Sequence, residues 1–206
     1  AKRNGLAKRV IVQGDGEILL RLAPEPVTVL IAGTGSMCLQ RTKGETFRWG
    51  GLGPILDDRG SGYWLVVQAL RRGITRLESG TSSPMLNRLM DVMGLSQVSE
   101  LVEGVHGSWD RARLATLAPW IFEMQNLDPD AKTIIQEGIN DLAKLLERAH
   151  QNTPRSHLIL AGGLLVRSDS YREMLLNQVQ GPLDFQNVTI AENPTLGAVQ
   201  QALELA

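Results

Sequence analysis

Two aspartates beside glycine-rich turns are the residues of this chain best suited to catalytic chemistry. Asp15 follows a β-branched stretch at residues 10–12 and lies between two glycines, whereas Asp58 directly precedes a helix-like segment. A carboxylate at the edge of a glycine-lined cleft can accept hydrogen bonds from two sugar hydroxyls, or take the proton of an attacking hydroxyl. Structural roles stay open at this point, because Asp15 also suits a turn and Asp58 a helix cap.

Three glycine clusters follow or interrupt the predicted strands. They are Gly-Thr-Gly-Ser at residues 33–36, Gly-Gly-Leu-Gly at residues 50–53, and Gly162-Gly163. Ligands of open α/β sheets bind where strands end, and glycine lets backbone N–H groups approach a phosphate or a sugar. One such cluster alone is equally typical of a tight turn. Three of them at strand ends favour a ligand cleft.

The sequence lacks the residue patterns of several other common catalytic sites. The three histidines show no metal-ligand spacing and Cys38 has no second thiol, so we expect neither a metal site nor a cysteine nucleophile. The chain also has no Gly-x-x-x-x-Gly-Lys-Ser/Thr segment, which excludes a P-loop kinase.

Strand-like segments must position these turns. Four short apolar segments are predicted to share one mixed sheet: residues 10–12, Val27–Ala32, 158–161 and 188–191. Residues 37–41 and 46–49 alternate apolar and polar side chains around Lys43-Gly44, a pattern that predicts a hairpin.

Helical periodicity dominates the middle of the chain and returns near its end. The predicted helices are residues 61–77, Pro84–Met93, 98–102, 112–124, 131–149, 171–179 and 196–205. Trp109 and Trp120 fall in this region and are interpreted as core residues. We expect the helices of residues 84–149 to lie to one side of the sheet, which predicts one α/β domain with an α-helical insertion.

Composition narrows the class of partners. With 21 basic and 22 acidic residues the net charge is −1, so nothing attracts nucleic acid electrostatically. The longest apolar run, Val27–Ala32, is far shorter than a membrane span, and a single cysteine suits a reducing cytoplasm. The sequence starts without methionine and runs almost directly into a predicted strand, which we interpret as a truncation point.

Five ordered segments carry a resemblance to a known family. Residues 30–36, 50–64, 115–119, 161–163 and 194–198 resemble the C-terminal lobe of the N-acetylglucosamine kinase family and its bacterial glucosamine kinase relatives. These are BadF/BadG/BcrA/BcrD-type ATPases of the actin-like superfamily. The resemblance implies an actin-like (ribonuclease H-like) α/β lobe over residues 1–206. It also implies phosphorylation of N-acetylglucosamine or glucosamine with ATP and Mg²⁺.

The same resemblance implies a role for each matching residue. It makes Asp15 the catalytic base, Asp58 a sugar-hydroxyl acceptor and Thr34 a phosphate contact. The implied sugar contacts are Ser36, Met37, Gly51, Leu52 and Gly53, and the implied adenosine contacts are Ala115, Gly162 and Gly163. No residue is assigned as a metal ligand.

Departures from the family pattern leave the identity of the sugar open. Met37 replaces a polar sugar contact, Leu52 a usual tryptophan, Asp57 a common glycine and Arg59 a common glutamate. The family's Asp-Gly-Gly-Gly-Thr phosphate hairpin is absent from this sequence, so we expect the isolated chain to be inactive. A non-catalytic actin-like nucleotide-binding or regulatory protein remains the alternative, and a homodimer remains open. Dehydratase activators of the superfamily need cysteines for an iron–sulfur cluster, and this chain has only Cys38.

Overall fold

The computed structural model describes residues 14–193, 195 and 197. The strand predicted at residues 10–12 and nearly all of the helix predicted at 196–205 lie outside this part. The strands are β1 (Val27–Ala32), β2 (Ser36–Thr42), β3 (Glu45–Gly50), β4 (His157–Ala161) and β5 (Val188–Ile190). The helices are α1 (Asp15–Leu19), α2 (Gly62–Glu78), α3 (Pro84–Met93), α4 (Val98–His106), α5 (Arg111–Ala115), α6 (Ala118–Glu123), α7 (Pro129–Asn152), α8 (Gly163–Arg167) and α9 (Asp169–Val179).

One mixed sheet, in the order β3-β2-β1-β4-β5, forms the centre of the α/β part of the structure. β1 pairs antiparallel with β2 and parallel with β4, and β5 adds a further parallel strand. The predicted hairpin is confirmed as β2 and β3, joined by Lys43 and Gly44. Both turn residues have positive φ, +52° and +79°, as a two-residue type I′ hairpin turn requires. The shared sheet is confirmed for the three predicted strands that the structure describes.

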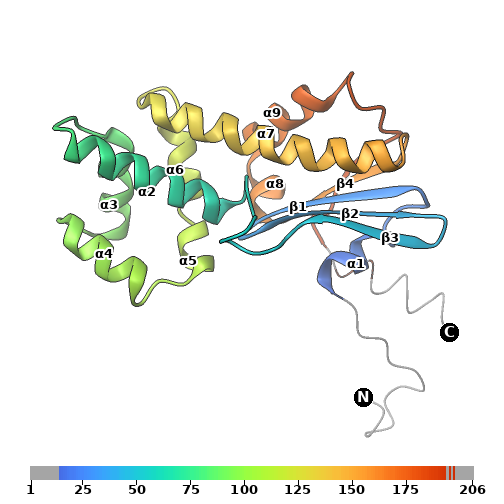
Figure 1. The fold of residues 1–206 in the computed structure, drawn as a ribbon, viewed down its shortest axis with the longest axis horizontal. Helices are drawn as coiled ribbons and strands as arrows, with labels where there is room; N and C mark the ends of the chain where they lie inside the picture. The colour runs from blue at the N-terminus through green and yellow to red at the C-terminus, as the bar shows by residue number, and fades with distance from the viewer. Residues whose placement is uncertain (1–13, 194, 196, 198–206) are drawn as a thin grey trace, which may run out of the picture.

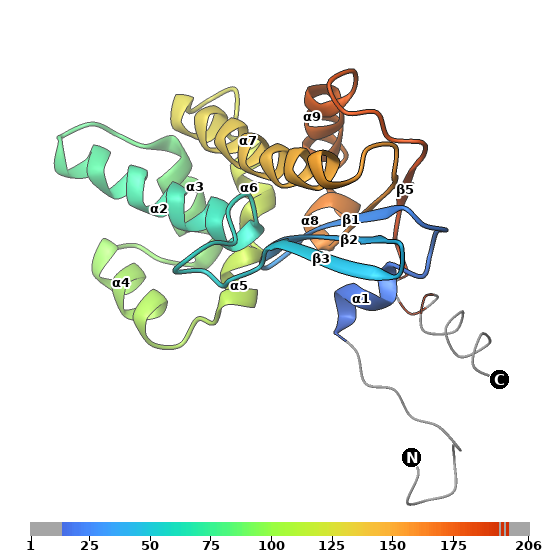
Figure 2. The ribbon, with the colours of Figure 1, turned by 45° about the vertical axis from the view of Figure 1, so that its right-hand side comes forward.

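Alternate residues of β1 face two different helical layers. Leu30 and Ala32 belong to the core shared with α7, α8 and α9, whereas Val27 and Val29 pack with Leu19 of α1. Figures 1 and 2 show α7 and α9 above the sheet and α1 below it. The central strands β1 and β4 are therefore buried on both faces, which explains their continuous apolar runs.

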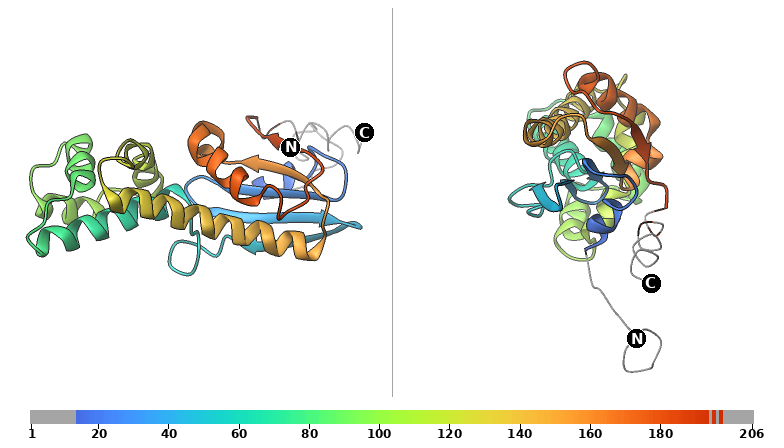
Figure 3. Two further views of the ribbon diagram at one scale, coloured as in Figure 1. Left: turned by 90° about the horizontal axis from the view of Figure 1, so that it is seen from above. Right: turned by 90° about the vertical axis from the view of Figure 1, so that its right-hand side faces the viewer.

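Helices α2 to α6 gather beyond one end of the sheet (Figure 1), and α7 runs from this helical block back along the sheet (Figure 3). The expectation that all helices of residues 84–149 lie to one side is therefore wrong for α7. Its buried stripe, which includes Ile139, Leu142 and Leu146, packs on both the sheet and α2. No helix of the described residues is long and apolar enough to span a membrane.

Two helix predictions need correction. The segment 112–124 forms two helices, α5 and α6, separated at Thr116 and Leu117. Pro119 lies in the first turn of α6, where its missing N–H costs nothing, and a continuous helix would have lost a hydrogen bond there. The five-residue helices α1 and α8 were not predicted, because so few residues show no periodicity.

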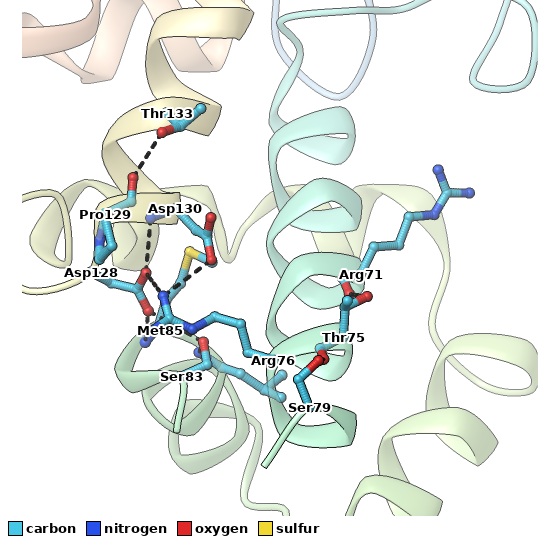
Figure 4. Close-up of polar contacts among 11 residues, drawn as sticks. Arg71, Thr75, Arg76, Ser79, Ser83, Met85, Asp128, Pro129, Asp130 and Thr133 are labelled. Carbon is cyan, nitrogen blue, oxygen red and sulfur yellow. Dashed lines mark hydrogen bonds and ion pairs between the residues drawn. The ribbon is translucent and has the colours of Figure 1, made fainter. Parts of the chain in front are cut away.

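Asp128 connects α2 and α3 of the helical block with the start of α7 (Figure 4). Its buried carboxylate accepts hydrogen bonds from Ser83 Oγ at 3.2 Å, Met85 N at 3.0 Å and Asp130 N at 3.0 Å. Arg76 Nη1 of α2 lies 3.5 Å from the same carboxylate. A buried charge with this many partners fixes the ends of α2, α3 and α7 relative to one another.

Candidate active-site cleft

Two cavities meet at the end of β1 and share Gly33 and Thr34 in their walls. The large cavity, about 570 Å³, lies between the helical block and α8. The small cavity, about 360 Å³, lies beside the loop that follows β3. Of the sequence-predicted site residues, Thr34, Ala115 and Gly163 line the large cavity. The small cavity is lined by Thr34, Ser36, Met37, Gly51, Gly53 and Asp58.

The loops after β1 and β4 come together because these strands are parallel and end at the same edge. A Cβ placed on Gly33 would lie 3.4 Å from Gly163 N and 3.7 Å from Gly162 Cα. Gly162 has φ +89°, and a Cβ there would lie only 2.4 Å from Ala32 O. Only glycine fits that position. Gly162 itself, which was predicted to contact adenosine, does not line the large cavity, whereas Gly163 does.

The start of α2 joins the β1 loop to α5. Gly62 N donates to Gly33 O at 2.8 Å, and a Cβ on Gly62 would lie 3.1 Å from Ala115 O. This close approach holds the last residue of α5 against the large cavity. Ala118, Pro119 and Phe122 of α6 extend the same apolar wall.

Asp58 is buried at the small cavity in an unusual backbone conformation. Its φ is +59°, which aspartate tolerates better than most residues and which is often found at functional sites. Its carboxylate accepts from Ser36 N at 3.3 Å and from Arg111 Nη2 at 2.6 Å. The helix-cap interpretation of Asp58 is wrong, because Ser61 caps α2 through its contact with Trp64 N at 3.2 Å.

The residues after Asp58 are held by hydrogen bonds from the sheet and from α9. Ser36 Oγ donates to Arg59 O at 2.7 Å, and Tyr171 Oη donates to Gly60 O at 3.0 Å. Burial, and to a lesser extent the charge of Asp141, raises the pKa of the Tyr171 phenol, so this group stays a protonated donor. The Asp58 carboxylate is thus held by its own loop as well as by its partners.

The loop after β3 forms the rim of the small cavity. Gly51 and Gly53 have φ values of +70° and +88° and line the cavity. Arg48 Nε donates to Gly50 O at 3.1 Å, and its Nη2 donates to Gly51 O. Leu52 is 66% exposed and does not line the small cavity, unlike its two glycine neighbours.

Asp15 is the first residue of α1, so its backbone belongs to a helix rather than to a simple turn. Its side chain lies outside the described part of the structure. The adjacent Gly16 packs closely on the sheet, since a Cβ there would lie 2.8 Å from Leu39 Cδ1 and 3.0 Å from Ile31 Cδ1. Ile31 and Met37 also line the small cavity. The start of α1 therefore adjoins residues of that cavity.

Arg111 and Arg48 are among the residues at the cleft that sequence reasoning missed. Arg111 lines the small cavity and stands 53 positions from its partner Asp58. Asp110 signals a helix start and indeed caps α5 through Arg113 N at 2.7 Å, but no local pattern indicates where the Arg111 side chain points. The described residues contain no group of three or more His, Cys, Asp or Glu suited to a metal. Burial raises the pKa of the Cys38 thiol, so this group stays protonated.

Comparison with known proteins gives a consistent set of relatives. The N-acetylmuramic acid/N-acetylglucosamine kinase of Clostridium acetobutylicum is 30% identical over 108 residues, which cover 50% of this chain and 35% of that protein. The N-acetyl-D-glucosamine kinase of Dictyostelium discoideum is 26% identical over 192 residues, covering 85% and 58%. The chain thus spans less than two thirds of the length of either curated relative.

A crystal structure of a proposed N-acetylglucosamine kinase from Chromobacterium violaceum has the same fold. It superposes with a TM-score of 0.72 at 24% identity, covering 90% of this chain and 63% of that one. This likeness confirms the predicted α/β fold. The sequence model of the BadF/BadG/BcrA/BcrD ATPase family matches residues 2–202, and the chain belongs to that family.

Proposed function

We propose that residues 1–206 form the C-terminal lobe of an ATP-dependent kinase that phosphorylates an amino sugar, N-acetylglucosamine or glucosamine. The observation that carries this proposal is the joined pair of cavities at Gly33 and Thr34. One cavity holds a buried carboxylate and the other has apolar walls, as a sugar and an adenosine would require. Membership of an ATPase family and the kinase activities of the two curated relatives support the same proposal.

The small cavity is the proposed sugar site. Asp58 retains lone pairs beyond those used by Ser36 N and Arg111, so it can accept hydrogen bonds from sugar hydroxyls. The glycine backbone at Gly51 and Gly53 lets the sugar approach closely, and Met37 supplies an apolar wall. Leu52 reaches this site only if its loop moves, since its side chain is 66% exposed.

The large cavity is the proposed adenosine site, and the residues present fit that group. Ala115, Pro119, Phe122 and Leu164 offer an apolar slot for the base, and Thr34 stands where the two cavities meet. A phosphate chain reaching from one cavity to the other passes this residue. Polar groups for the ribose come from Arg167, Ser168 and Ser170.

Mg²⁺, when bound, neutralises phosphate charge during transfer. The described residues offer no cluster of three or more candidate ligands, so we expect the ion to be held chiefly by the nucleotide.

Asp15 is the proposed general base. It directly precedes Gly16, whose backbone packs against Ile31 of the small cavity. In phosphoryl transfer the attacking hydroxyl must lose its proton as the phosphoryl group arrives in line, and a carboxylate at this edge would accept that proton.

The phosphate hairpin is proposed to come from an N-terminal lobe. Its Asp-Gly-Gly-Gly-Thr pattern is absent from these 206 residues, and the chain matches 35% and 58% of the two curated relatives. Positioning of the γ-phosphate supplies much of the rate in phosphoryl transfer. We therefore expect the isolated chain to bind its ligands weakly and to phosphorylate nothing at a useful rate.

A cytoplasmic location and a homodimer are further expectations. The first follows from the use of ATP and from the single, buried cysteine. For the second, Ile55 and Leu56 are 93% and 78% exposed in the loop beyond the sugar site, and a second copy would cover them. Sedimentation of the full-length gene product decides the assembly.

The proposal is tested by turnover of the full-length gene product with ATP and each sugar. ADP release and the mass of the phosphorylated sugar are measured together. Asp15→Asn should lower kcat by roughly 10²–10⁴, the usual contribution of a general base, with a much smaller change in sugar KM. Glu17→Gln, an exposed neighbour on the same helix, is the matched control and should keep full activity.

Full activity of Asp15→Asn would remove the assigned base. ATP binding without any sugar-dependent turnover in the unaltered protein would instead favour the non-catalytic, regulatory alternative.

A further inference from the structure

Arg111 is held at the wall of the proposed sugar site by a short ion pair. Its Nη2 lies 2.6 Å from Asp58 Oδ2, and the guanidinium carbon lies 5.3 Å from the ring centroid of Tyr63. The two partners come from different parts of the lobe, since Arg111 begins α5 of the helical block and Asp58 precedes α2. Ala115, one turn further along α5, packs against Gly62, so the helix that carries Arg111 is itself fixed.

The ion pair determines the net charge of the described wall of the small cavity. Asp58 and Arg111 are the two charged residues in its described wall, and the other wall residues are glycine, apolar or hydroxyl-bearing. Asp58 is only 4% exposed, so its charge is weakly screened by water. With Arg111 beside it, the pair sums to zero, so the described wall exerts no net attraction on a cation entering the cavity.

We propose that Arg111 is a positioning and specificity-determining residue of the sugar site, which orients Asp58 and makes the cavity favour the uncharged N-acetylated sugar over protonated glucosamine. This inference rests on the proposed function. Arg111 holds one carboxylate oxygen while Ser36 N contacts the other, and the lone pairs left over are therefore directed. Removing the guanidinium would leave a buried anion that loosens its hold on hydroxyls but attracts an ammonium group.

The test compares the Kd of N-acetylglucosamine with that of glucosamine on the full-length gene product, at a pH below the pKa of the glucosamine amine. Arg111→Met keeps most of the side-chain length against Tyr63 but removes the charge. It should raise the Kd of N-acetylglucosamine roughly tenfold and leave that of glucosamine level or lower, because a buried hydrogen-bonded charge has lost its partner.

Two further variants separate charge from packing. Arg111→Lys keeps a positive charge without the planar fork, so it should restore part of the preference for the N-acetylated sugar. Arg113 lies two residues further along the same helix, with its side chain over Trp109 and outside the small cavity. Arg113→Ala is therefore the control and should change the Kd of neither sugar.

The outcomes distinguish failure of the specificity role of Arg111 from failure of the proposed sugar site. Equal weakening of both sugars by Arg111→Met, or no change in either, would overturn the specificity role while leaving the sugar site in place. If the unaltered protein bound neither sugar, the proposed function would fail and this inference with it. A loss of the preference for N-acetylglucosamine in Arg111→Met, with part of that preference regained in Arg111→Lys, would support the role of the positive charge.

Discussion

The small cavity is walled by loops with positive φ and by an ion pair whose carboxylate is buried. The large cavity is walled mainly by glycine backbone and apolar side chains of α5, α6 and α8, with a polar edge at residues 167–170. In the first, Asp58 and Arg111 must meet across 53 residues of sequence. In the second, Gly33 and Gly162 must meet across the ends of two paired strands. The two halves of one cleft therefore depend on different physical forces.

This difference predicts different sensitivities. The small cavity should respond to changes of charge at constant volume, because its polar groups are paired and partly desolvated. The large cavity should respond to added volume at constant charge, because its backbones already touch. Each prediction below changes one property in one half.

Gly162→Ala is the volume change with the largest expected effect. The new methyl group would lie 2.4 Å from Ala32 O in a residue whose φ is +89°, so strand β1 or β4 must shift. We expect a loss of about 3 kcal/mol in the free energy of unfolding, measured by urea denaturation.

Gly163→Ala is its matched control. A Cβ at Gly163 meets nothing within 4 Å and the residue begins α8, so stability should change by less than about 0.5 kcal/mol. Equal losses in both variants would show that close backbone approach does not determine the geometry of the large cavity.

Asp58→Asn is the charge change, and its effect should appear in binding. An amide keeps the volume but cannot supply the charged acceptor, and it leaves Arg111 without its partner. Calorimetry on the full-length gene product should show sugar Kd raised roughly 30- to 100-fold, the loss of one or two charge-assisted hydrogen bonds, with nucleotide Kd within about twofold.

Asp57→Asn provides the comparison for this variant. The neighbouring carboxylate lies outside the small cavity, so its neutralisation should leave both affinities unchanged. A similar loss of sugar affinity in both variants would mean that the loop as a whole, and not the Asp58 carboxylate, makes the site.

The same contrast explains how far the sequence predicts this molecule. The β2–β3 hairpin, α3 and α7 were predicted because turn residues and amphipathic periodicity are local signals. The expected cleft residues were Asp15, Thr34, Asp58 and Gly162. Thr34 and Asp58 line the two joined cavities, whereas Gly162 lines neither and its neighbour Gly163 lines the large one. The Asp15 side chain lies outside the described structure. The role of each stays a prediction.

What the sequence does not predict depends on tertiary contacts. Arg111 resembles any helix-surface arginine until α5 is packed against α2. The break between α5 and α6 had a local signal in Pro119, which the apolar periodicity of residues 112–124 outweighed. The side-chain position of Asp15 lies outside the described structure, so its place in the cleft rests on the packing of Gly16.

The most direct test of the two-site cleft is an NMR titration of the 206-residue chain, because weak binding is easily detected by shifts of backbone amides. N-acetylglucosamine should shift the amides of Gly35, Ser36 and Asp58, and ATP should shift those of Ala115, Gly163 and Leu164. Gly33 and Thr34, which line both cavities, should respond to either ligand. Shifts of one common set of amides by both ligands, or sugar-induced shifts confined to residues outside the small cavity, would contradict the account.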